Sequence, residues 1–131
     1  MTFVDTGAWA AFFVSEDADH RAAVAWMREN NDLLVTSDFV VDELLTLLKS
    51  RFSVASAVQA GEALWAESLS AVVFLSPSDI AEAWRIFRRY TDKDWSFTDC
   101  TSSAVMKRLG IRRVFSFDQD FSQMSGIHRV P

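Results

Sequence analysis

The sequence predicts a three-layer α/β/α sandwich with a mainly parallel central sheet of four to five strands. Short apolar runs of strand length alternate along the chain with longer segments of helical character, an order typical of parallel sheets joined by crossover helices. Apolar residues make up 50% of the 131 residues, enough to build a core without disulfide bonds. Only 4 glycines and 2 prolines are present, so we expect no linker and interpret residues 1–131 as a single domain.

The N-terminal part of the chain is predicted to form a strand, two helices and a second strand. Residues 2–4 are a short apolar run that stops at Asp5. Residues 6–13 are apolar, and residues 20–30 repeat apolar side chains at helical spacing, which indicates two helices. Residues 33–36, Leu-Leu-Val-Thr, are expected to be a buried strand.

Two helices and a third strand are predicted for the middle of the chain. Ser37 or Asp38 can cap a helix that runs to about residue 51. Its apolar side chains cover more than one face, which indicates deep burial or a partner. A second helix is expected over residues 53–69, capped by its first serine. Residues 71–75 are apolar throughout, as in strands covered on both faces.

The last third of the chain is predicted to hold two helices and two strands. A Ser-Pro-Ser-Asp motif combines a cap, a proline and a capping-box acid, and predicts a helix over residues 77–90. After a polar loop, residues 98–109 are expected to be helical, with Gly110 as the stop. Residues 114–117 and 128–130 are the remaining strand candidates.

Composition excludes several classes of protein. Lysine and arginine total 13 and aspartate and glutamate total 18, so the formal net charge is −5, which counts against coating nucleic acid by bulk positive charge. The single cysteine, Cys100, excludes an intrachain disulfide and a cysteine-based zinc site. No apolar run approaches the ~18 residues that span a bilayer, and no signal peptide is evident. We therefore expect a cytoplasmic protein without membrane association.

Four acids fall where a parallel sheet would bring them together. Asp5 and Asp118 each follow a predicted strand, Glu43 lies one to two turns into the helix after the second strand, and Asp99 opens a later helix. Ligands of open α/β sheets bind beyond the carboxyl ends of the strands. Clustered carboxylates repel one another and need a cation. With only 2 histidines and 1 cysteine, magnesium or manganese is the natural candidate, and such sites hydrolyse phosphodiesters.

The acids lie in four stretches of sequence: residues 3–9 (FVDTGAW), 36–44 (TSDFVVDEL), 95–102 (WSFTDCTS) and 115–121 (FSFDQDF). In order and spacing these stretches resemble the PIN-domain ribonucleases, in particular the VapC toxins of bacterial and archaeal toxin–antitoxin pairs. The resemblance extends over nearly the whole chain. One such motif alone would be weak, but four together are specific.

The resemblance implies a PIN-like fold that cleaves RNA with Mg²⁺ as cofactor and Mn²⁺ as a substitute. Asp5, Glu43, Asp99 and Asp118 match the family's acidic quartet. Asp120 is the alternate for the fourth position, because both aspartates lie in the last stretch. The resemblance also implies a homodimer and a cognate VapB-like antitoxin whose C-terminal segment inhibits the site.

The hypothesis assigns a role to each group. The three aspartates of the quartet coordinate metal directly or through water, while Glu43 completes the site or deprotonates the attacking water. Thr6 and Thr98 are expected to orient the carboxylates through their hydroxyls. The products should carry 5′-phosphate and 3′-hydroxyl ends.

The same acids can also have purely structural roles. Ser96 and Asp99 have capping-box spacing, Asp118 and Asp120 can be turn residues, and Asp5 can cap the helix that follows it. The alternative function is therefore a catalytically inactive PIN-like module that receives a partner peptide or RNA.

Several side chains outside the quartet can have either a structural or a functional role. Trp95, in the loop before Asp99, packs in the core or stacks on a base. The helices around residues 40–48 and 54–69 carry apolar surface that suits a dimer or antitoxin interface. Two basic clusters either lie at helix ends as ordinary surface or contact the RNA backbone; they are Arg85, Arg88 and Arg89, and Lys107, Arg108, Arg112 and Arg113.

Overall fold

The computed structural model describes residues 1–131 and confirms the predicted α/β/α class. Five parallel strands form one sheet in the order β3-β2-β1-β4-β5. The strands are β1 (Thr2–Val4), β2 (Leu34–Ser37), β3 (Ala71–Val73), β4 (Arg113–Phe115) and β5 (His128–Val130). All three residues of β1 are buried, because this strand lies at the centre of the sheet.

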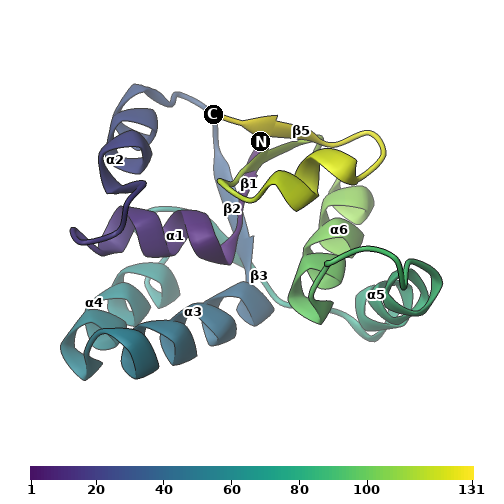
Figure 1. Cartoon of the computed structure of the whole chain (residues 1–131), viewed down its shortest axis with the longest axis horizontal. Helices are drawn as coiled ribbons and strands as arrows, with labels where there is room; N and C mark the ends of the chain where they lie inside the picture. The colour runs from purple at the N-terminus through teal and green to yellow at the C-terminus, as the bar shows by residue number, and fades with distance from the viewer.

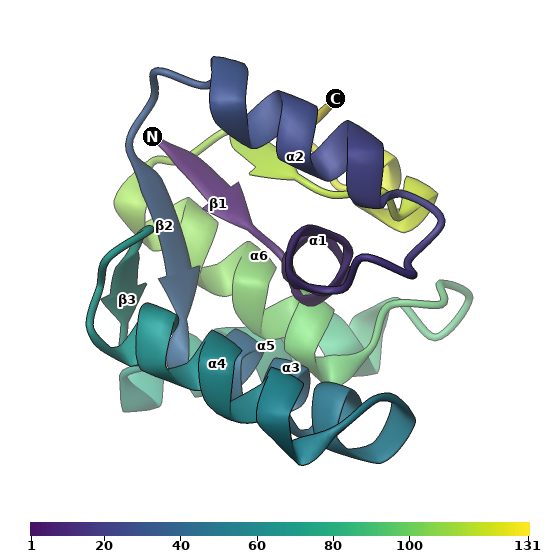
Figure 2. The ribbon, with the colours of Figure 1, turned by 90° about the vertical axis from the view of Figure 1, so that its left-hand side faces the viewer.

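Helices cover both faces of the sheet (Figures 1 and 2). One layer holds α1 (Thr6–Phe13), α2 (His20–Glu29), α3 (Asp38–Arg51) and α4 (Val54–Trp65). The other holds α5 (Pro77–Arg89) and α6 (Phe97–Leu109), which pack against each other. A short 3₁₀ helix, η1 (Gln119–Gln123), lies between β4 and β5. No helix combines the length and the apolar character needed to cross a membrane.

The core joins the central strands to the helices on both sides. Its largest fully buried side chains include Trp9 of α1, Phe3 of β1 and Phe115 of β4. The Trp9 indole donates a hydrogen bond to the Thr36 hydroxyl at 3.2 Å, and that hydroxyl donates to the Val4 carbonyl at 3.0 Å. This chain of bonds links α1, β2 and β1 directly beneath the edge where the strands end.

The third strand is shorter and more exposed than the sequence predicts. It covers Ala71–Val73 and pairs only with β2, so it is an edge strand. Only Val72 is buried, while Ala71 is exposed and Val73 half-buried, so the strand is not covered on both faces as expected. Phe74 is 67% exposed. The ladder ends because the Leu75 amide donates to the Asp38 carboxylate at 3.0 Å rather than to a neighbouring strand.

Two further bounds differ from the prediction, and the others agree to within one residue. The helix expected over residues 53–69 ends at Trp65, because Glu67 adopts a left-handed conformation with φ 54°. The strand expected over residues 114–117 covers Arg113–Phe115. The chain then turns, because the Ser116 hydroxyl accepts the Asp118 amide at 3.0 Å.

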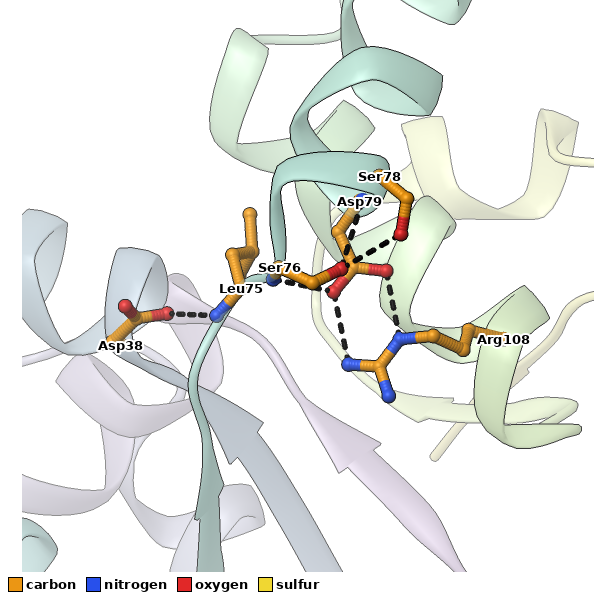
Figure 3. A network of polar contacts seen from close by, with 6 residues as sticks. All are labelled: Asp38, Leu75, Ser76, Ser78, Asp79 and Arg108. Carbon is orange, nitrogen blue, oxygen red and sulfur yellow. Dashed lines mark hydrogen bonds and ion pairs between the residues drawn. The ribbon is translucent and has the colours of Figure 1, made fainter.

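A polar network fixes α5 against its neighbours (Figure 3). Ser76 and Asp79 form the predicted capping box. Both carboxylate oxygens of Asp79, which is 3% exposed, accept bonds from Arg108 of α6 at 2.8 and 2.9 Å. Asp38 of α3 holds the connection from β3 through the Leu75 amide. The network therefore ties both helical layers to the turn after β3.

Candidate active site

Asp5 follows β1 and begins α1, and it is only 5% exposed. One carboxylate oxygen accepts the Ala8 amide at 2.8 Å, and the other accepts the Ser116 hydroxyl at 2.6 Å. Burial raises the pKa of Asp5 to about 7 against the lowering effect of these two hydrogen bonds, and the charges of Asp99 and Asp118 raise it further. Asp5 thus caps a helix and belongs to a group of mutually repelling acids.

Asp99 is the third residue of α6 and forms the capping box expected from its spacing. Its carboxylate accepts the Ser96 amide at 3.0 Å, and its own amide donates to the Ser96 hydroxyl at 3.0 Å. Burial raises the pKa of Asp99 to about 6, and the charges of Asp118 and Glu43 add to this rise. Asp99 can therefore cap α6 and belong to the acidic cluster at the same time.

Asp118 follows β4 after two intervening residues and begins η1. Its carboxylate accepts the Asp120 amide at 2.9 Å. The charge of Asp118 is among the main causes that raise the pKa of both Asp5 and Asp99, and the charge of Asp120 is not among them. Asp118 is accordingly the aspartate of this stretch that lies with the other acids.

Asp120 faces a different neighbourhood. Its backbone carbonyl accepts the Trp95 indole N–H at 3.0 Å. Burial and the charges of Asp118 and Asp94 raise its pKa. The sequence left Asp118 and Asp120 as alternates for the fourth acid, and this geometry favours Asp118.

Glu43 reaches the cluster from α3. The residue is half-buried, on a helix whose Val40, Val41 and Leu44 are buried in the core. Helix α3 packs against α6, and the charge of Glu43 raises the pKa of Asp99. The structure therefore brings together all four acids that the sequence singled out.

No basic side chain neutralises these four acids. The ion pairs of the molecule use Asp32, Asp79, Glu82 and Asp92 as their acidic members. The donor set is made of carboxylate oxygens alone, which fits hard divalent cations such as magnesium or manganese. As the side chains are placed, no three His, Cys, Asp or Glu residues form a group that would hold an ion directly.

Ser116 is a site residue that the sequence analysis missed. Its hydroxyl donates to Asp5 and accepts the Asp118 amide, so it joins the ends of β1 and β4. Thr6 and Thr98 form no side-chain hydrogen bond with a carboxylate; Thr98 instead uses its backbone carbonyl to accept the Thr101 hydroxyl at 2.6 Å. Their predicted role in orienting the acids stays a prediction. The only signal for Ser116 was its place in the stretch 115–121.

The two basic clusters are divided between ion pairs and free side chains. Arg85 and Lys107 pair with Glu82 at 2.7 and 3.4 Å, and Arg108 pairs with Asp79. Arg113 lies 3.9 Å from Asp32. The members without an ion pair are Arg88, Arg89 and Arg112.

Residues 2–127 match the PIN domain. The chain is 38% identical over 125 residues to the "23S rRNA-specific endonuclease VapC20" of Mycobacterium tuberculosis, covering 93% of this chain and 92% of that protein. It is 27% identical over 116 residues to "Ribonuclease VapC26" of the same species, covering 88% of this chain and 85% of the relative.

Solved structures show the same likeness. The crystal structure of Mycobacterium tuberculosis VapC20, described as a sarcin–ricin loop cleaving toxin, superimposes with a TM-score of 0.89 at 33% identity and covers 94% of both chains. FitAcB from Neisseria gonorrhoeae shares the fold with a TM-score of 0.73 at 16% identity, covering 100% of this chain and 97% of that chain. Sequence, fold and relatives agree, and the protein belongs to the PIN-domain family, among the VapC ribonucleases.

Proposed function

We propose that this protein is a magnesium- or manganese-dependent endoribonuclease and the toxin of a toxin–antitoxin pair. One observation carries the proposal: four carboxylates from four separate segments gather at one sheet edge without a basic partner. Burial and mutual repulsion raise the pKa of Asp5 to about 7 and of Asp99 to about 6. Proteins keep such an unfavourable cluster at functional sites, where a bound cation offsets the charge.

In this proposal Asp5, Asp99 and Asp118 hold the ion. When bound, a divalent cation lowers the pKa of water and offsets the negative charge of the phosphate. The Ser116 hydroxyl and the Ala8 amide keep the Asp5 carboxylate in one orientation. Glu43 completes the ligand set or accepts the proton of the attacking water. The products would carry 5′-phosphate and 3′-hydroxyl ends.

Ribosomal RNA is the proposed substrate. VapC20 is named as specific for 23S rRNA and as a toxin that cleaves the sarcin–ricin loop. The identity of 38% over 93% of the present chain supports the same class of substrate here. The protein would then act in the cytoplasm, where ribosomes are found.

An apolar groove between α3 and α4 is the proposed contact with a VapB-like antitoxin. The groove encloses about 480 Å³, and its lining includes Leu45, Ala57, Val58 and Trp65. Val58 and Trp65 are about half exposed, at 51% and 48%, which is unusual for large apolar side chains without a partner. A homodimer is proposed as well, as the relationship to the VapC ribonucleases implies.

The proposed activity is tested by cleavage of 23S rRNA with Mg²⁺ and with EDTA. We expect Asp5→Asn and Asp99→Asn to lower the rate by at least about 100-fold, because each loses several kcal/mol of transition-state stabilisation. Asp42→Asn is the matched control, since Asp42 is an exposed acid beside Glu43. Equal cleavage by all variants, or undiminished cleavage in EDTA, would refute the proposal. Metal binding without turnover on any RNA would instead support the inactive binding module.

A further inference from the structure

A small cavity lies between the C-terminal end of α5 and the N-terminal end of α6. It encloses about 230 Å³, and its walls include Phe87, Tyr90, Lys93, Trp95 and Cys100. This volume is below the 300–1,000 Å³ of pockets for drug-sized ligands, so it suits a single planar ring system.

The cavity adjoins the acidic cluster. Cys100 in its wall directly follows Asp99, and the charge of Asp99 acts on the Cys100 thiol. Trp95 forms another part of the wall, and its indole N–H donates to the Asp120 carbonyl at 3.0 Å. That bond ties the wall to the segment that carries Asp118. A nucleotide whose phosphate lies at the acids would therefore have its own base or a neighbouring base within reach of the cavity.

The aromatic side chains of the wall differ in solvent exposure and in the contacts that hold them. Trp95 is half-buried, packs against the core and is held by its hydrogen bond to Asp120, so it is a fixed wall. Tyr90 is 37% exposed and lies 5.2 Å from Trp95 between ring centroids at 58°. Phe87 is 41% exposed. Phe87 already stacks on Trp84, with ring centroids 6.0 Å apart, and meets Phe97 edge-on at 5.8 Å. Tyr90 has no stacked aromatic neighbour, so it is the ring of the wall on which a base can stack.

Two basic side chains lie beside the same cavity in a protein with a net charge of −5. The Arg89 guanidinium lies 5.6 Å from the centre of the Tyr90 ring. Lys93 belongs to the wall of the cavity and lies 3.9 Å from the exposed Asp92. Arg89 takes part in no ion pair. Aromatic faces that receive a base, with cations nearby for the backbone phosphates, are the usual means of binding unpaired RNA.

We propose that this cavity binds one unpaired base of the RNA, within two nucleotides of the cleaved phosphate, by stacking on Tyr90. The inference rests on the proposed ribonuclease function and names the part of the site that selects the position of cleavage. Tyr90 acts here as a specificity residue.

The test combines a Tyr90 variant with substrates that lack single bases. A synthetic RNA hairpin containing the sarcin–ricin loop is prepared with an abasic nucleotide at each of the positions around the cleavage site. We expect one abasic position to lower kcat/KM of the wild type about 10- to 100-fold, in line with the stacking of one base. Tyr90→Ala should lower kcat/KM on the intact hairpin by a similar factor and lose no more than about threefold at that abasic position.

Two further variants show whether the effect depends on the aromatic ring at Tyr90. Tyr90→Phe keeps the ring and should retain most of the activity. Phe52→Ala removes an aromatic side chain that is 45% exposed at the far end of α3, and should behave as the wild type. The cavity proposal is overturned if Tyr90→Ala cleaves the intact hairpin as fast as Phe52→Ala. It is also overturned if every abasic position affects both proteins equally.

Failure of the ribonuclease proposal would look different. The wild type would then cleave neither the hairpin nor 23S rRNA. The cavity is in that case tested by titrating the four nucleoside 5′-monophosphates while the indole N–H signal of Trp95 is followed by NMR. A saturable shift that Tyr90→Ala abolishes and Phe52→Ala retains supports the cavity, and no shift overturns it.

Discussion

Ser116 shows how one neutral side chain can organise a group of charges. It is fully buried and bonds to the Asp5 carboxylate and to the Asp118 amide at once. A hydroxyl suits this position because it donates and accepts simultaneously. Without it, Asp5 would keep only the Ala8 amide as a hydrogen-bond partner.

We expect Ser116→Ala to lower kcat/KM for RNA cleavage about 10- to 100-fold, the usual effect of losing a residue that orients a metal ligand. The Mg²⁺ concentration for half-maximal rate should rise at the same time. Ser125→Ala, at an exposed serine, is the control. An unchanged Mg²⁺ dependence in Ser116→Ala would contradict a positioning role, because a loss of folded protein alone lowers the rate without altering that dependence.

The buried Asp5 carboxylate should destabilise the metal-free protein. Its pKa is about 7 in the fold and 3.8 ordinarily, so folding favours the protonated form. Stability therefore falls as the pH rises from about 4 through 7. In EDTA at pH 8 we expect Asp5→Asn to be more stable than the wild type by about 1–3 kcal/mol.

Thermal unfolding at two pH values checks this expectation. At pH 5 most of the gain in Asp5→Asn should vanish, because the wild-type carboxyl is then protonated. A destabilised Asp5→Asn protein at pH 8 would show that the hydrogen bonds from Ser116 and Ala8 outweigh the desolvation of the charge.

At the scale of elements, the contact between α5 and α6 depends on the Asp79–Arg108 pair. Hydrogen bonds from Arg108 hold the pKa of Asp79 below its ordinary value. The pair's stabilisation is thus complete above the unfolded-state pKa near 3.9 and is lost as the pH falls through the lowered folded-state value. Removal of Arg108 would leave a carboxylate that is 3% exposed without its cationic partner.

We expect Arg108→Ala to lower the free energy of unfolding by about 2–3 kcal/mol at pH 7, less than for a fully buried pair because Arg108 is 40% exposed. Arg85→Ala, which breaks an exposed pair with Glu82, should cost less than about 1 kcal/mol. Denaturant unfolding at several pH values measures both. An Arg108→Ala protein that loses as much stability on acidification as the wild type would contradict the assignment.

Elements governed by local chemistry were predicted from the sequence, and those governed by distant contacts were not. The capping boxes at Ser76 and Ser96 lie within four consecutive residues, so their motifs were sufficient. The length of β3 depends on the Asp38 carboxylate, 37 positions away from Leu75 in the sequence. No pattern within the apolar run of residues 71–75 reports that contact.

At the scale of the whole molecule, the acidic edge and the α3–α4 groove are separate surfaces. The groove residue Val58 is 51% exposed on α4. Asp5 and Asp118 follow β1 and β4, Asp99 lies in the first turn of α6, and Glu43, from within α3, acts on Asp99 rather than lining the groove. Cleavage of RNA and binding of the antitoxin should therefore be separable by mutation.

We expect Val58→Glu to weaken the complex with the cognate antitoxin at least about tenfold, because a charge would enter an apolar contact. RNA cleavage by the free protein should be unchanged. Gln59→Glu adds the same charge at the neighbouring exposed position outside the groove and should bind normally. Co-purification with the product of the adjacent gene measures binding, and equal retention by both variants would place the antitoxin elsewhere.

The sequence by itself determined the α/β order and the capped helices, and it singled out Asp5, Glu43 and Asp99 with Asp118 or Asp120 as the fourth acid. These depend on periodicity, on local motifs and on the rule that parallel strands end at one edge. Only the tertiary structure decided that Asp118 rather than Asp120 joins Asp5, that Ser116 bonds to both ends of the site, and that a cavity opens beside Asp99. Ser116 and Asp5 lie 111 positions apart. Such contacts arise when separate segments pack together, and no local pattern encodes them.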